Sequence, residues 1–142
     1  MKKRPVLLLE VLLALLLLVI CAVPLVKQPL KLYREEITYL EKMEKERLAD
    51  WSFTEIKELL LKNGIPWEKL PEKDGSAGPF FLPDAKLDVP GCKNCVVKRR
   101  FMLTGRGAKE GMQGQLYRQL GVYIFLNDAK YEFRIAVQKL NI

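Results

Sequence analysis

Residues 6–26 of the chain read VLLLEVLLALLLLVICAVPLV, after a short leader, residues 1–5, that ends in Pro5. Glu10 is the one charged residue among these 21 positions. A bilayer core about 30 Å thick is crossed by roughly 20 apolar residues in a helix. The segment therefore predicts a single transmembrane helix over residues 6–26, preceded by a basic leader.

The composition limits what the rest of the chain can be. Of the 142 residues in total, roughly 115 follow the apolar segment, enough for one small domain. The sequence has no histidine, which excludes Ser-His-Asp and Cys-His catalysis and His-ligated zinc. Three cysteines are too few for a four-thiolate zinc site. No paired carboxylates with a supporting acid or base are evident, so we expect no enzyme, no cofactor and no metal site.

The net charge is modest once the leader is set aside. The whole chain carries +7, three of these charges lie in the leader, and Glu10 offsets one, which leaves +5 for residues 27–142. That charge is ordinary for a small domain, so we expect no nucleic-acid partner.

Three interpretations of the apolar segment compete. A cleaved secretory signal needs small residues before the cut, and only Ala22 is available among bulky neighbours. A lipoprotein signal would use Cys21, but Ile20 stands where a small residue is normal. The sequence therefore favours a retained membrane helix.

Glu10 is the unusual residue of this helix. A carboxylate at the centre of a membrane helix costs about 2.5 to 3.5 kcal/mol, somewhat less near an end, and usually faces a partner. Alternatively, Glu10 lies shallow enough to stay hydrated beside the basic leader. The stretch LLEVLLAL at residues 8–15, after Lys-Lys-Arg, resembles the N-terminus of type IV pilins and type II secretion pseudopilins.

The resemblance implies both a fold and a function. It implies a long N-terminal helix and a small antiparallel sheet, in a structural subunit that assembles through the helix, with Glu10 neutralising the terminal amine of a neighbouring subunit. Its expected partners are other pilin-like subunits and the inner-membrane secretion machinery. The expected location is the inner membrane, crossed once, with the C-terminal domain in the periplasm. The processing point would lie between Pro5 and Val6, although the family has glycine where this chain has Pro5, so the leader is either cut or retained.

The rest of the chain predicts a helix followed by strands, an α+β pilin-like order. A helical continuation and a second short helix are expected over residues 27–63. The second helix would start at Ser52, because Ser52 and Glu55 match a capping box. Residues 64–94 are rich in proline and glycine and predict an irregular connection, with a short strand at residues 80–82.

Residues 95–142 predict an antiparallel sheet. The strands are expected at residues 95–104, 116–126 and 130–140, with Asn127-Asp128 as a tight hairpin turn. The last strand alternates apolar and polar residues, as a half-buried strand does. The glycine-rich stretch between the first two strands, residues 105–114, predicts a hairpin loop rather than a phosphate cradle.

Two further features have more than one interpretation. Cys92 and Cys95 form a single CxxC, which predicts a disulfide or free thiols ahead of metal bridging or redox catalysis.

Arg99 belongs to a basic cluster with neighbouring lysines and arginines, yet it is in phase with Val97 and Phe101. It is therefore either part of a solvated rim or paired with a buried or interfacial carboxylate. As an alternative to the pilin-like subunit, the chain would be a single-pass anchored adaptor or lipoprotein that binds a protein partner through its basic sheet.

Overall fold

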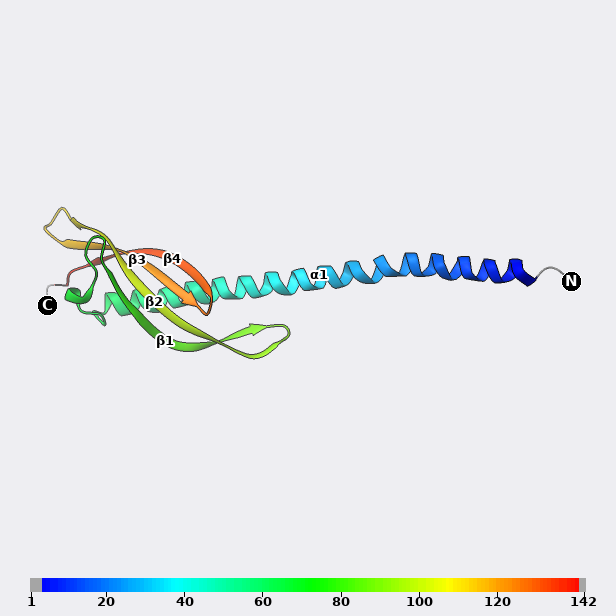
Figure 1. Ribbon diagram of the computed structural model, residues 1–142. Coiled ribbons are helices and arrows are strands. Elements are labelled where there is room, and N and C mark those ends of the chain that lie inside the picture. The colour runs from blue at the N-terminus through cyan, green and yellow to red at the C-terminus, as the bar shows by residue number, and fades with distance from the viewer. Residues whose placement is uncertain (1–3, 141–142) are drawn as a thin grey trace. The chain divides into compact units, whose positions relative to one another are not determined.

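The computed structural model describes residues 4–140, with side chains from residue 6 onward. The fold is α+β, with one long N-terminal helix followed by a four-stranded antiparallel sheet, as in the pilin-like layout (Figure 1). The elements are α1 (Arg4–Leu61), the 3-10 turn η1 (Trp67–Lys69), β1 (Ser76–Val89), β2 (Cys92–Glu110), β3 (Leu116–Leu126) and β4 (Ala129–Gln138).

The chain divides into two units, Met1–Leu40 and Glu41–Ile142, which are described separately. In the first unit, residues 6–26 are helical, and α1 is long and apolar enough in this part to cross a membrane. Its Leu-rich sequence favours a helix, and Pro24 and Pro29 lie within α1. None of the most apolar 18-residue window is buried inside the protein, so the segment has apolar side chains all round and no covering layer from the described chain.

The second unit is a head in which the last part of α1 packs on the sheet. The buried helix residues recur at spacings of one to four and lie on one face: Leu48, Ala49, Ser52, Ile56 and Leu60. Ile56 is fully buried. This is the amphipathic pattern of a helix that covers a sheet.

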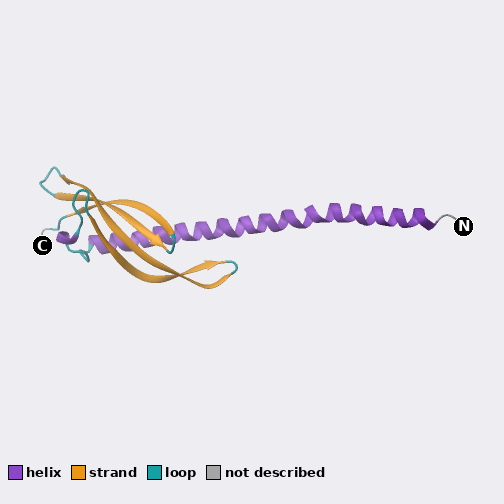
Figure 2. Cartoon of the chain, viewed as in Figure 1, coloured by secondary structure: helices purple, strands orange, loops and turns teal. Residues whose placement is uncertain are grey.

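The strands follow one another in the sheet in chain order, each antiparallel to the next (Figure 2). Side chains alternate between the two faces of each strand. One face holds the core residues of the sheet, among them Phe101, Leu103, Val122 and Ile124, and packs with the helix. The other, which we call the outer face, holds mainly polar, charged and aromatic side chains.

The expected turn between β3 and β4 is confirmed. Asn127 has a φ of 51°, a left-handed conformation that asparagine tolerates in tight hairpins. Its backbone N–H donates to the Lys98 carbonyl, and its Oδ1 accepts from the Lys98 N–H. The turn therefore also closes the β2–β3 ladder.

Two expectations about local structure are wrong. No second helix begins at Ser52, because α1 continues without a break to Leu61. Residues 76–89 of the expected irregular connection form β1, which pairs with β2 despite its prolines by means of three register shifts. The expected short strand at residues 80–82 lies within β1. A third expectation is also wrong in extent: β2 continues to Glu110, so the loop before β3 is shorter than the glycine-rich stretch indicates.

One glycine is required by close backbone packing. The segment before β1 crosses β2 at Gly105, where Lys73 forms a bridge with it. A Cβ at Gly105 would lie 1.6 Å from the Glu72 carbonyl oxygen, so no other residue fits there without a shift of the backbone.

Candidate functional site

Glu10 lies on α1 with its side chain exposed. Its neighbours one turn away on the helix, Val6, Leu7, Leu13 and Ala14, are apolar. Within the described part of the chain, no ion pair joins Glu10 to another residue. The carboxylate therefore lies in an apolar helical surface without a neighbouring cation from the described residues.

The expected processing point lies at the start of α1. The backbone of Pro5 is helical, in the first turn, where proline is tolerated because its missing N–H has no partner in a helix. The Pro5 side chain lies outside the described side chains, as do the leader lysines. Val6 is 65% exposed. The free Cys21 is also exposed on the helix.

Arg99 is the clearest built feature of the head. Its side chain is 3% exposed, and its Nη1 lies 2.8 Å from Oε2 of Glu55. Nη1 also donates to Ser52 Oγ at 3.1 Å, and Nε donates to the Pro83 carbonyl at 2.7 Å. The guanidinium lies 5.3 Å from the centroid of the Trp51 ring. The interpretation in which Arg99 is buried and paired with a carboxylate is confirmed, with Glu55 one-third exposed, and the solvated rim is wrong for this residue.

The capping-box residues turn out to be the partners of Arg99. Ser52 and Glu55 are three residues apart inside the helix, so they lie on the same face one turn apart. Ser52 Oγ donates to the Leu48 carbonyl at 2.7 Å and accepts from Arg99. The contact thus joins α1, β1 and β2 at one point, which fixes the sheet on the helix.

Arg118 has a similar role that the sequence analysis missed. Its Nη1 donates to the Trp67 and Leu70 carbonyls at 2.8 and 2.9 Å, and its guanidinium lies 4.6 Å from the Trp67 ring centroid. It holds the connection between helix and sheet. The alternation along β3 could have indicated this role. Arg118 is in phase with the buried Leu120 and Val122, just as Arg99 is in phase with the core of β2.

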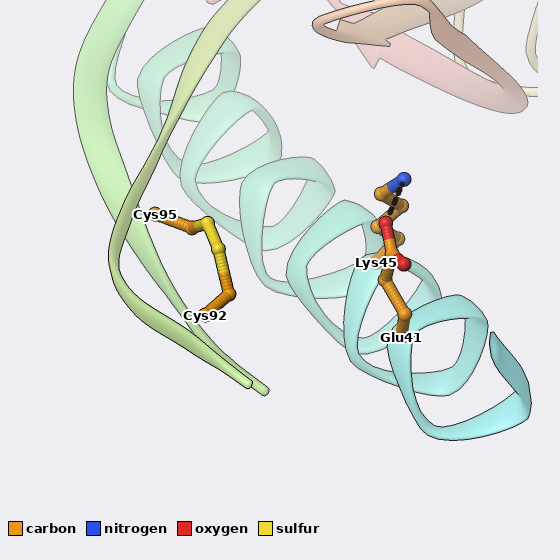
Figure 3. The surroundings of a disulfide bond; sticks show 4 residues. All are labelled: Glu41, Lys45, Cys92 and Cys95. Atoms are coloured by element: carbon orange, nitrogen blue, oxygen red, sulfur yellow. Dashed lines mark ion pairs between the residues drawn. A yellow bond between two sulfur atoms is a disulfide. The ribbon is translucent and has the colours of Figure 1, made fainter. Parts of the chain in front are cut away.

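Cys92 and Cys95 form a disulfide, with Cα atoms 5.7 Å apart, a distance ordinary for such bonds. The pair begins β2, directly after the Pro90-Gly91 turn. Figure 3 shows it at this hairpin tip, together with the Glu41–Lys45 ion pair on α1. The structure therefore favours the disulfide among the expected alternatives and places it where only two strands are paired.

The rest of the basic cluster is more exposed than Arg99. Lys98 and Arg100 are on the outer face of the sheet, and the Arg100 guanidinium lies 5.1 Å from the Phe125 ring centroid. A hollow of about 420 Å³ beside them is lined by residues that include the 77% exposed Phe81. Arg106 pairs instead with Glu132 of β4. The cluster is therefore an inward residue and several outward ones rather than a single binding site.

Glu44 and Tyr131 are two of the four described side chains of the head with shifted pKa values, the others being Arg47 and Glu58. The hydrogen bond from Arg47 lowers the pKa of Glu44 below its usual range, with a further contribution from the arginine charge. Burial raises the pKa of Tyr131, and the nearby Glu46 carboxylate raises it further. Neither group lies near a nucleophile, so these shifts concern stability.

Comparison with known proteins gives no match: no family model, no curated protein and no solved structure is similar to this chain at a significant level. The resemblance to the pilin-like family thus stays a prediction from the stretch around Glu10.

Proposed function

We propose that this chain is a pilin-like structural subunit of a type II secretion or related envelope export apparatus, which assembles through its N-terminal helix. It is held in the inner membrane by residues 6–26, and its head lies in the periplasm. Its work is mechanical, with no reaction of its own.

The observation that carries the proposal is the carboxylate of Glu10 within a fully apolar helical surface. Inside a bilayer such a group is costly when unpaired and stabilising when it meets a cation from another molecule. The cation is the terminal amine of a neighbouring subunit if the leader is cut before Val6, and a basic side chain if it is retained. Glu10 then sets the register of one helix against the next.

The layout of the chain supports the same proposal. A long helix followed by a four-stranded antiparallel sheet is the pilin-like order. The apolar part of the helix is uncovered by the described chain, which leaves it available both to lipid and to other helices.

The test is the substitution Glu10→Ala, with Leu9→Ala as the matched control one position away. We expect both variants to remain in the membrane fraction, since each keeps the apolar segment. Glu10→Ala should abolish cross-linking between the N-terminal helices of neighbouring subunits in intact membranes, whereas Leu9→Ala should keep it. Unchanged cross-linking of the N-terminal helices in the Glu10→Ala chain would overturn the proposal.

The outer face favours one alternative, an anchored adaptor or lipoprotein that binds a protein partner through its basic sheet. Lys98 and Arg100 lie beside the exposed Phe81 in a hollow that Asp84 and Asp128 also line, which gives an aromatic surface with charges of both signs for such a partner. The mass of the mature chain distinguishes the classes. Loss of residues 1–5 supports prepilin processing, a lipid-modified Cys21 at the new terminus supports the lipoprotein, and intact Met1 leaves the Glu10 test to decide.

A further inference from the structure

The two edges of the sheet are built differently. The edge strand β1 contains Pro79 and Pro83 and has three register shifts against β2. Such features prevent another strand from pairing with an edge. The opposite edge strand, β4, pairs with β3 over ten residues with no shift and contains no proline. Only β4 therefore offers a regular edge.

The hydrogen-bond phase of β4 shows which of its backbone groups are unpaired. The Lys139 N–H donates to the Leu116 carbonyl at 2.9 Å, so Lys139 faces β3. Because backbone groups alternate sides along a strand, Gln138 and every second residue before it face away from β3. These outward-facing residues are Lys130, Glu132, Arg134, Ala136 and Gln138. In the described part of the chain no strand pairs with them.

We propose that this edge pairs with the same edge of a second copy of the chain, antiparallel, about a two-fold axis through Phe133. In this register Glu132 of each copy lies opposite Arg134 of the other, which gives two cross-strand ion pairs on the outer face. On the other face Phe133 meets Phe133, and Tyr131 meets Ile135. Opposite charges and apolar pairs in these positions stabilise antiparallel strands.

The charges select this register over its neighbours. A shift in one direction places Glu132 opposite Glu132, and a shift in the other places Arg134 opposite Arg134. Like charges directly opposite each other destabilise paired strands. A register that mixes the two faces would set apolar against polar side chains.

The surroundings of the edge have room for the pairing. Tyr131, Phe133 and Ile135 are half-buried, so a second copy would cover their exposed parts. Beside the edge lies a hollow of about 270 Å³ whose lining includes Arg106 and Arg134. Glu132 already accepts from Arg106 and has a second oxygen for Arg134 of the other copy.

The pair differs from the assembly proposed above and does not rest on it. Within the head, Tyr131 lies near Glu46, and Phe133 stacks on Phe53 with ring centroids 4.5 Å apart, so β4 runs in the same direction as α1. A two-fold axis across β4 therefore reverses the helix of one head relative to the other. An array whose subunits all point the same way cannot contain this pair, so the two states are alternatives.

Cysteine cross-linking of the full chain in detergent, with Cys21→Ala as background, tests the proposal. Phe133→Cys should form a covalent dimer on mild oxidation, because residues at the axis face each other as a close, non-hydrogen-bonded pair. Lys130→Cys and Gln138→Cys should not, since each lies far from its own copy in this register. No dimer from a folded Phe133→Cys chain, or equal cross-linking at all three positions, would overturn the proposal.

A charge exchange provides a second test, independent of the contact of Phe133 with Phe53. Arg134→Glu should weaken dimerisation by roughly tenfold, measured by sedimentation in detergent, because two attractive pairs become repulsive. The double variant Glu132→Arg, Arg134→Glu should restore it, and Arg100→Glu, away from the edge, should leave it unchanged. Failure of the double variant to restore the dimer would contradict the register. Glu10→Ala should not affect either result, which separates this inference from the proposed function.

Discussion

Residues 6–26 and residues 41–61 belong to the same helix, α1, but are stabilised in different ways. In the first segment no side chain of the most apolar window is buried by the described chain. In the second, one face is buried, and Ser52 and Ile56 have no exposed surface. The second segment is covered by the sheet, whereas the first is left uncovered by the described chain and is long and apolar enough to cross a membrane.

The difference teaches that helical structure alone does not define a folding unit. The head has its own core of apolar residues and its own polar contact at Arg99, and both lie within residues 41–142. Both tryptophans, Trp51 and Trp67, also lie there, so their fluorescence reports on the head alone. Substitutions in the two segments should therefore have separable effects.

The largest expected effect comes from the same kind of truncation made in both segments. Ile56→Ala removes a fully buried side chain and should lower the free energy of unfolding of the head by about 3 kcal/mol. Leu15→Ala, in the apolar segment, should leave it unchanged. Urea unfolding of the detergent-solubilised chain, followed by tryptophan fluorescence, measures both. Equal losses would contradict the separation.

Arg99→Met should have the next largest effect. It leaves Glu55, Ser52 and the Pro83 carbonyl without their donor, at a cost of about 2 kcal/mol, less than for a fully buried pair because Glu55 is one-third exposed. Arg100→Met, its neighbour on the outer face, is the control and should cost less than about 1 kcal/mol. Unfolding midpoints of the two variants provide the comparison.

The disulfide should contribute less. Replacing both Cys92 and Cys95 with serine should lower stability by about 1 to 2 kcal/mol, because the closed loop is very short. A reductant should have the same effect on the wild-type head and none on the double variant. A further loss on reducing the variant would show that the reductant acts elsewhere.

The smallest effect concerns pH. The pKa of Tyr131 is raised in the folded head, mainly by burial, so the folded state holds this proton more tightly than the unfolded chain. Its contribution to stability is complete below the ordinary tyrosine pKa of about 10 and is lost as the pH rises through the folded pKa. Tyr131→Phe should show a shallower loss of stability in this range. Parallel curves for the two proteins would contradict the assignment.

Much of the fold could be predicted from local pattern. The apolar run of residues 6–26 predicts its helix by composition. The strand β3 falls at the predicted residues because it is rich in apolar and aromatic residues and is followed by the Asn127-Asp128 turn. Alternation also placed Arg99 on the face of Val97 and Phe101, and a carboxylate partner was one of the two interpretations that this left open. These predictions depend only on neighbours in the sequence.

The rest depended on contacts between distant residues. Pro79 and Pro83 predict a break in a strand, but β1 tolerates them at the sheet edge by shifting its register. Ser52 and Glu55 resemble a helix start, whereas their role is to bind Arg99, 44 or more residues later in the chain. Spacing could not identify that partner, because several helix carboxylates were available.

Hydrogen exchange along α1, with the full chain in lipid nanodiscs, tests the contrast between the segments most directly. We predict slow exchange for residues 6–26, because lipid excludes water, and slow exchange for residues 41–61, because the sheet covers them. Residues 27–40, which neither the lipid nor the sheet covers, should exchange faster. Transfer of the chain from nanodiscs to a lipid-free polymer should speed exchange in residues 6–26 and leave residues 41–61 unchanged. Fast exchange of residues 6–26 in nanodiscs, or equal protection along the whole helix in both media, would contradict the account.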